Sequence, residues 1–176
     1  MNRYLNLGCG RKTKMGDAHA QVEVWVNADI VALPGVNCVM DINQPWPWPN
    51  DYFDGAEAIH VLEHAFDKMF PIQELWRVLK HGAVAIIEAP NFQSNPDCWA
   101  DPTHRNAWHP NTMAFTYPNH DYAYYSKARF ITVDYFHSNL YLHWELAAYK
   151  RDDPELLARH QDCANWRERW EKGGKA

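Results

Sequence analysis

The sequence predicts an α/β fold, a mainly parallel sheet with helices on both faces and an antiparallel edge strand. Strand-like apolar runs alternate with helical periodicity in the first half, a pattern that favours a parallel sheet. The first of these runs leads into a turn with two glycines, Gly8 and Gly10. Toward the other end, residues 128–136 and 139–149 alternate in polarity, which suits an antiparallel pair at the sheet edge.

The first run, Arg3 to Gly10, predicts a buried strand that ends at a sharp bend. Glycine at positions 8 and 10 permits positive φ and lets the main chain approach a ligand closely. In open α/β sheets, ligands sit beyond the carboxyl ends of the strands, where this turn would lie. An ordinary strand-to-loop turn is the alternative, because Gly-x-Gly alone is a weak motif.

Two further strand-like runs end in an acid. Residues 23–29 close at Asp29, which lies 19 positions after Gly10, and residues 35–41 close at Asp41. An acid about 20 residues past a Gly-rich turn is placed to accept hydrogen bonds from ribose hydroxyls. Each acid alone suits a cap or a turn. Together the three strand ends indicate a nucleoside site.

The alternation continues after a Pro-rich loop over residues 44–51, which excludes a strand or helix interior there. Residues 54–61 predict a fourth strand and residues 83–90 a fifth, buried one. Between them we expect a helix capped by Asp67 and ended by Gly82. Its apolar positions recur at helical spacing and are Met69, Ile72, Leu75, Trp76 and Leu79.

Several motifs in this order resemble the class I S-adenosylmethionine-dependent methyltransferases. The similarity covers roughly residues 3–136 and resembles small type 11-like proteins of bacteria and their phages. The segments that carry it are 5–12, 25–30, 41–54, 60–64, 74–82 and the Asp-Pro-Thr-His segment 101–104. The resemblance implies a Rossmann-like fold and S-adenosyl-L-methionine as cofactor. The chain departs from the pattern at Lys12, where a third glycine is usual, and in a shortened region after it.

The resemblance also implies which residues bind the cofactor. Asp29 would take the ribose hydroxyls, Asp41 would meet the adenine amino group, and Ile42 would pack on the ring. A basic residue after the Gly-rich turn, Arg11, Lys12 or Lys14, is a candidate for the methionine carboxylate, with a solvated basic loop as the alternative. The full predicted set is Leu7, Gly8, Gly10, Asp29, Ile30, Asp41, Ile42 and His60. For His60, a satisfied histidine at a strand end is the alternative.

Methyl transfer needs positioning more than acid–base help, but a hydroxyl acceptor would profit from a base near neutral pKa. The predicted catalytic residues are His64 and, across a long loop, Asp101 with His104. An aspartate that orients a histidine is a recurrent way to tune an imidazole base. The same Asp-Pro-Thr-His segment also suits a capped turn.

We expect one domain over residues 1–176. Residues 91–125 lose periodicity but carry many aromatic rings, so we expect an ordered segment that covers the substrate. A C-terminal helix over residues 153–172 would begin at Pro154 and pack on the domain or on a partner chain, as in a homodimer. Its apolar stripe comprises Leu156, Leu157, His160, Cys163, Trp166 and Trp170.

The composition of the chain limits the classes of partner that we expect it to bind. The net charge of −5 argues against nucleic acid as a partner, and no apolar stretch predicts a membrane span or a signal peptide. The four cysteines are far apart, which favours reduced thiols and a cytoplasmic location. A set of Cys98, Asp101, His104 and His109 suits zinc by residue type, but its spacing matches no recurrent pattern. We therefore expect no metal.

Two functions follow as alternatives. The first is an S-adenosylmethionine-dependent methyltransferase acting on a small molecule, a sugar or another non-nucleic-acid acceptor. The second is a cofactor-binding partner or regulatory subunit that no longer catalyses. Base methylation of nucleic acid is disfavoured, because residues 60–64 read His-Val-Leu-Glu-His rather than the Asn/Asp-Pro-Pro-Tyr/Phe or Pro-Cys patterns of such enzymes.

Overall fold

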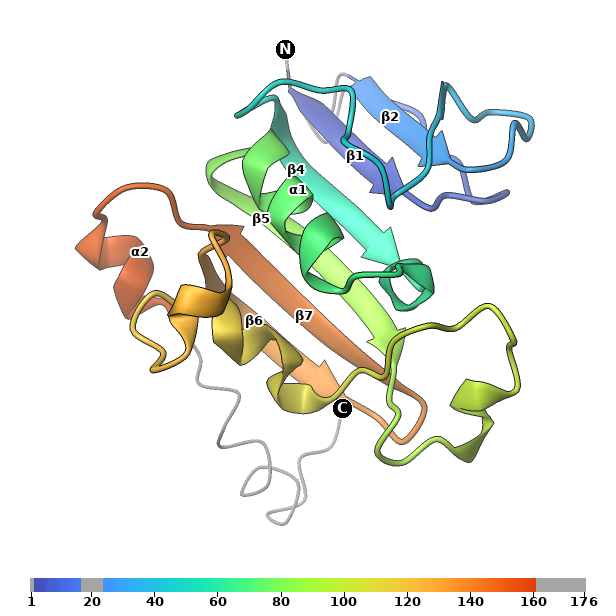
Figure 1. The fold of residues 1–176 in the computed structure, drawn as a ribbon. Helices are drawn as coiled ribbons and strands as arrows, with labels where there is room; N and C mark the ends of the chain where they lie inside the picture. The colour runs from blue at the N-terminus through green and yellow to red at the C-terminus, as the bar shows by residue number, and fades with distance from the viewer. Residues whose placement is uncertain (1, 17–23, 161–176) are drawn as a thin grey trace.

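A computed structural model describes residues 2–16 and 24–160 of the chain (Figure 1). In this part, seven strands form one sheet in the order β3-β2-β1-β4-β5-β7-β6. The strands are β1 (Arg3–Leu7), β2 (Val24–Asp29), β3 (Cys38–Val39), β4 (Phe53–Ile59), β5 (Leu79–Pro90), β6 (Phe130–His137) and β7 (Tyr141–Ala148). The α-helices are α1 (Met69–Val78) and α2 (Pro154–Ala158). The 3-10 helices are η1 (Leu62–His64), η2 (Pro96–Trp99), η3 (Pro110–Thr116) and η4 (Ala123–Tyr125).

The sheet is parallel from β3 to β5, and β7 runs antiparallel to both β5 and β6. This confirms the predicted mainly parallel sheet with an antiparallel edge. Because β1, β2 and β4 are parallel neighbours, their carboxyl ends lie at the same edge of the sheet. The chain segments that follow these three strands therefore meet there.

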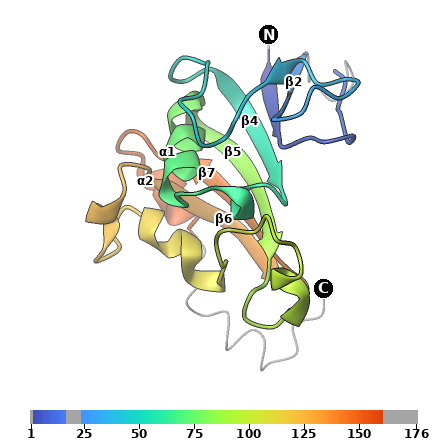
Figure 2. The same ribbon diagram turned by 45° about the vertical axis from the view of Figure 1, so that its right-hand side comes forward.

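One face of the sheet packs beneath α1 to form the main core (Figure 1). Leu5 and Leu7 of β1 point to this face together with Ile87 of β5, and all three are fully buried or nearly so. Helix α1 buries Ile72 and Leu75 against them, as its helical spacing predicts. Seen from the side, the segment with η3 covers the same face as α1 (Figure 2).

The other face is covered at the β6–β7 edge by α2. Leu156 of α2 packs against Ile131 and Ala147, which share a register row of the sheet opposite to the main core. Helices therefore lie on both faces, as predicted. Within the predicted helix over residues 153–172, α2 covers Pro154–Ala158, and the part of the prediction beyond residue 160 lies outside the described residues.

The boundary between α1 and β5 differs from the prediction. We expected the helix to continue through Leu79 and end at Gly82, but α1 ends at Val78 and β5 begins at Leu79. Leu79 has extended backbone and pairs with Phe53 of β4. The pairing then shifts register before Val84, and Gly82 with φ of +77° lies in this irregular stretch. The glycine thus allows a bulge in the strand instead of ending the helix.

Residues 91–125 are ordered as three 3-10 helices joined by turns, which agrees with their loss of periodicity. Pro96 and Pro110 stand at the first positions of η2 and η3, where a missing N–H costs nothing. Trp108 between them is fully buried, and its ring centroid lies 5.8 Å from that of Trp144 on β7. This ring and Met113 of η3 fasten the segment to the core.

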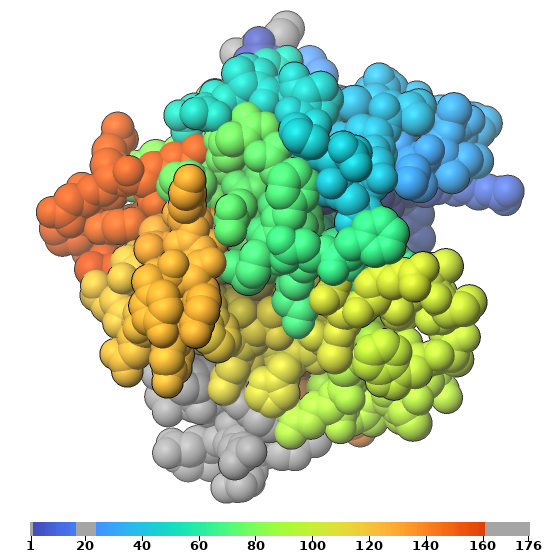
Figure 3. Space-filling view, in the orientation of Figure 1, coloured from blue at the N-terminus to red at the C-terminus, as the bar shows by residue number. Residues whose placement is uncertain are grey.

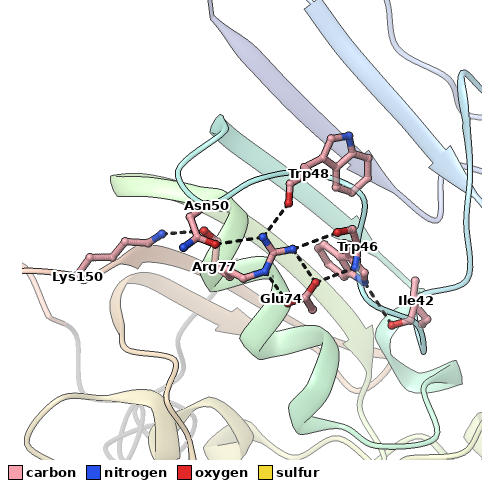
Figure 4. Close-up of polar contacts among 7 residues, drawn as sticks. All are labelled: Ile42, Trp46, Trp48, Asn50, Glu74, Arg77 and Lys150. Atoms are coloured by element: carbon pink, nitrogen blue, oxygen red, sulfur yellow. Dashed lines mark hydrogen bonds and ion pairs between the residues drawn. The ribbon is translucent and has the colours of Figure 1, made fainter.

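Arg77 near the end of α1 holds the Pro-rich loop against the helix (Figure 4). Its guanidinium donates to both carboxylate oxygens of Glu74 at 2.6 and 2.7 Å, and to the carbonyl oxygens of Trp46 at 3.2 Å and Trp48 at 2.7 Å. Burial opposes ionisation of Glu74, but hydrogen bonds from Arg77 and from the Trp46 amide outweigh it, so the pKa of Glu74 is lowered. Trp46 Nε1 in turn donates to the Ile42 carbonyl at 3.3 Å.

We expect Arg77→Met to lower the free energy of unfolding by at least about 2 kcal/mol, because it leaves a partly buried carboxylate and two carbonyls without their donors. Urea unfolding followed by fluorescence measures the loss. Arg151→Met is the matched control, since Arg151 is exposed and the same substitution there removes a surface charge. Equal stability of the two variants would show that the Arg77 contacts contribute nothing.

No helix among the described residues combines the length and the apolar character needed to cross a membrane.

Candidate functional site

The turn after β1 is built around Gly8. Its backbone has φ of +65°, and its N–H donates to the Ala28 carbonyl of β2 at 2.8 Å. Gly10 also has positive φ, and its N–H donates to Oδ2 of Asp29 at 2.8 Å. The turn is therefore tied to the end of β2 by main-chain and side-chain bonds, and its glycines adopt the backbone conformation that the sequence predicted.

A cavity of about 460 Å³ opens at the carboxyl ends of β1, β2 and β4. The residues around it come from the turn after β1, the ends of β2 and β3, the exit of β4 and the segment near residue 103. In the space-filling view, the green residues after β4 face the yellow-green residues near 105 at this edge of the molecule (Figure 3). Seven of the eight predicted cofactor residues line the cavity, namely Leu7, Gly8, Asp29, Ile30, Asp41, Ile42 and His60.

The eighth, Gly10, is not among the lining residues and contributes through its bond to Asp29. The structure thus brings the predicted set together at one place. The binding roles of these residues stay predictions.

The two strand-end acids present carboxylates that are already oriented. Asp29 accepts from the Gly10 and Val31 amides, one on each oxygen, at 2.8 and 3.0 Å. Asp41 accepts through Oδ1 from both the backbone and the side-chain amide of Asn43, at 2.9 and 2.8 Å. Because a carboxylate oxygen has two lone pairs, each acid retains capacity to accept hydrogen bonds from a ligand.

Sequence reasoning missed several lining residues. Asn43 is one, and its side-chain oxygen accepts from the Phe66 amide at 2.7 Å, which links the end of β3 to the exit of β4. An Asn two residues after Asp41 was the available signal, since this spacing is typical of Asx turns. Phe66 and Arg105 carried no comparable signal, because only the fold brings them to the cavity.

His60 occupies a strained position at the end of β4. It is a non-glycine residue with φ of +51°, and its amide donates to the Glu88 carbonyl of β5 at 2.9 Å. Its Nδ1 lies 3.6 Å from Oε1 of Glu63. The interaction with Glu63 raises the pKa of His60, although burial of the ring opposes the shift. Such strain is stored where the surroundings hold it, commonly at ligand sites.

The predicted catalytic residues gather beside the cavity, but only one of them lines it. His64 is a lining residue, and so is Thr103, whereas Asp101 and His104 are not. The Thr103 hydroxyl donates to Asp101 Oδ1 at 2.5 Å and lies 3.0 Å from His64 Nδ1, so an Asp-Thr-His chain leads to the cavity. Hydrogen bonds from the Thr103 hydroxyl and amide lower the pKa of Asp101.

His104 is oriented by a different partner from the one we expected. Its Nδ1 hydrogen-bonds the Cys98 carbonyl, and its Nε2 lies 3.8 Å from Asp101 Oδ2 and 3.9 Å from Glu63 Oε1. The ring centroids of His64 and His104 are 5.0 Å apart. The two histidines therefore lie beside Glu63, whose side chain is only 1% exposed.

The set weighed for zinc from the sequence is replaced by another group. His109 caps η3 by accepting from the Asn111 amide at 3.1 Å, and Cys98 contributes its carbonyl to His104. Among the described residues, the ligand atoms that gather within 4.8 Å of one another belong to Glu63, His64 and His104.

The fold is shared with solved structures, among them methyltransferases. A methyltransferase from Archaeoglobus fulgidus that depends on S-adenosylmethionine aligns over 78% of this chain with a TM-score of 0.50 and 21% identity. The methyltransferase domain of the citrinin polyketide synthase aligns over 85% with a TM-score of 0.60 and 13% identity. The YcgJ protein from Bacillus subtilis aligns over 86% with a TM-score of 0.55 and 11% identity. At these identities the likeness establishes the fold.

The alignments cover different shares of the other proteins. The chain spans 66% of the Archaeoglobus protein, 47% of the citrinin synthase structure and 93% of YcgJ. No protein-family model matches the sequence, and no curated protein matches it.

Proposed function

We propose that this chain is an S-adenosylmethionine-dependent methyltransferase that acts on a small molecule, a sugar or another non-nucleic-acid acceptor. The observation that carries the proposal is the cavity at three parallel strand ends, with Gly8, Asp29 and Asp41 around it. Its volume of about 460 Å³ is in the range of small-molecule sites. The shared fold supports the same conclusion.

The residues present fit an adenosine-bearing ligand. Asp29, held by the Gly10 and Val31 amides, offers lone pairs to a ribose diol. Asp41 offers an acceptor to an adenine amino group, and Ile42 beside it offers an apolar wall for the ring. When bound, S-adenosylmethionine supplies an electrophilic methyl group. The protein then has to hold the acceptor in line with it, a task that lowers the barrier by positioning.

The residues next to His64 support the proposal that a methyl acceptor binds at this side of the cavity. Thr103 and Arg105 bring the 91–125 segment to the cavity, and the Glu63 carbonyl accepts from the amides of Arg105 and Asn106 at 2.8 and 3.1 Å. These bonds fix the segment beside the exit of β4. The net charge of −5 favours an acceptor other than nucleic acid.

A second candidate is a cofactor-binding subunit without catalysis. It is favoured by the short connection after Gly10, where the described residues 11–16 form no helix. In this candidate the ligand binds in the same cavity, and its binding regulates a partner chain.

One experiment separates the two candidates. Calorimetry with S-adenosylhomocysteine tests binding, which both functions require. Incubation of the full chain with labelled S-adenosylmethionine and a pool of small-molecule acceptors then tests turnover. Release of S-adenosylhomocysteine that depends on the acceptor supports the enzyme. Binding without release supports the subunit, and absence of binding contradicts both.

We expect His104→Ala to leave the affinity for S-adenosylhomocysteine within about threefold of the unchanged chain while lowering turnover at least about tenfold. The reason is that His104 does not line the cavity, but its ring centroid lies 5.0 Å from that of His64, which does. His120→Ala is the matched control, because His120 lies in the 91–125 segment and is absent from the cavity wall. A parallel loss of affinity and turnover would mean that His104 is structural.

A further inference from the structure

We propose that Glu63, His64 and His104 form a binding site for one divalent transition-metal ion, with Zn²⁺ as the best fit. One carboxylate oxygen and one ring nitrogen from each histidine lie within 4.8 Å of one another. This inference goes beyond the cofactor cavity and does not depend on the proposed function. It rests on the buried carboxylate, the orientation of the two rings and the spacing of the ligand atoms.

The Glu63 carboxylate is buried without sufficient compensation. Its side chain is 1% exposed, and among the described residues Oε2 has no hydrogen-bond partner. Oε1 lies 3.6 Å from His60 Nδ1 and 3.9 Å from His104 Nε2, both beyond a good hydrogen bond. Buried charges in proteins are generally paired closely or coordinate metals. A cation at this point would satisfy the carboxylate.

The two histidines are oriented as metal ligands commonly are. His104 Nδ1 faces the Cys98 carbonyl, which only accepts, so this nitrogen carries the proton. His64 Nδ1 lies 3.0 Å from the Thr103 hydroxyl oxygen, whose proton is donated to Asp101. In the tautomer that these hydrogen bonds favour, the proton is on Nδ1 and Nε2 of each ring is the nitrogen left to bind a metal. Ligating histidines usually donate their other N–H to such outer partners, which fix the tautomer and the ring direction.

The spacing suits a metal better than direct hydrogen bonds. In a tetrahedral site with zinc–ligand bonds of about 2.1 Å, the ligand atoms lie about 3.4 Å from one another, so the 3.9 Å between His104 Nε2 and Glu63 Oε1 has to shorten by about half an ångström. The pairs that lie up to 4.8 Å apart need to approach by up to about 1.4 Å. The backbone around the site is pinned, because the Glu63 carbonyl accepts from the amides of Arg105 and Asn106.

Three protein ligands leave one tetrahedral position open. Two histidines with one carboxylate is a ligand set of catalytic zinc sites, which keep that position for water or substrate. His64 lines the cavity, so the site borders the space where an acceptor would lie. The class of ligand at the open position is an oxygen or sulfur atom, whose pKa the metal would lower.

The test is Zn²⁺ binding by the full chain without an affinity tag, stripped with a chelator and titrated in the absence of S-adenosylmethionine. We expect one Zn²⁺ per chain, and at least about 100-fold weaker binding for His64→Ala and for Glu63→Gln. Thr103→Val, which removes an outer partner, should weaken binding by about 10- to 100-fold. His120→Ala is the matched control and should retain the affinity.

Co²⁺ substitution provides a spectroscopic readout, since visible absorption bands report the coordination of the bound ion. Circular dichroism checks that each variant folds, and His64→Ala serves if Glu63→Gln does not fold, because His64 is only half-buried. Affinity that is equal in the unchanged chain and in His64→Ala, or absent in both, overturns the proposal. Zn²⁺ binding in a chain that fails to bind S-adenosylhomocysteine would contradict the proposed function and leave the metal site standing.

Discussion

Replacing Gly8 by alanine is expected to destabilise the protein by about 3 kcal/mol, the largest effect of any single substitution considered. A Cβ at this position would lie 2.3 Å from Cγ2 and 2.5 Å from Cβ of Val61, which is buried. The φ of +65° adds about 1–2 kcal/mol for a residue other than glycine. Overpacking contributes a further 1–3 kcal/mol, roughly. Chemical unfolding followed by circular dichroism measures the sum.

Gly82→Ala separates the two contributions. Gly82 has φ of +77°, but no atom lies within 4 Å of the Cβ that would be added. We therefore expect a loss of only about 1 kcal/mol there. Adding Val61→Ala to Gly8→Ala should relieve the overpacking, so that the double variant loses less than the sum of the single effects. Equal losses for Gly8→Ala and Gly82→Ala would show that contact with Val61 does not matter.

Asp29→Ala is expected to weaken S-adenosylhomocysteine binding by roughly 100-fold. Two hydrogen bonds from ribose hydroxyls to a charged group, at about 1.5 kcal/mol each, correspond to this factor. The variant also removes the acceptor for the Gly10 amide, so the turn after β1 loses its tie to β2. Isothermal titration calorimetry on the folded variant measures the change.

The control for Asp29→Ala is Asp121→Ala, which removes an exposed acid that does not line the cavity. Its affinity should match that of the unchanged chain. If Asp29→Ala binds as tightly as this control, the ribose assignment is wrong, and the carboxylate serves only to hold the turn.

Much of the fold followed from the sequence because its signals are local. The apolar run into Gly8 and the acids at Asp29 and Asp41 mark strand ends, and parallel pairing then places those ends together. The end of α1 could not be predicted from the local sequence. Leu79 continues the helical spacing, but its pairing with Phe53 overrides that preference.

The candidate site was predictable only in part. His64, Asp101 and His104 attracted attention as residue types, yet nothing in the sequence indicated that Glu63 lies buried among them. The Glu63 carbonyl accepts from the amide of Arg105, which belongs to a distant segment that only the fold brings beside it. A glutamate between a leucine and a histidine is equally compatible with exposure, so the sequence alone could not rank it.

The contacts of the Arg77 guanidinium limit which substitutions this protein can accept without a change in its cavity. The guanidinium clasps the loop that carries Trp46, and Trp46 in turn holds the carbonyl of Ile42 at the cavity wall. The stability of the fold and the shape of the apolar cavity wall at Ile42 thus depend on the same side chain. Substitutions in the last turn of α1 that alter the contacts of Arg77 would change both properties at once. A variant selected for higher stability there would therefore also differ in ligand binding.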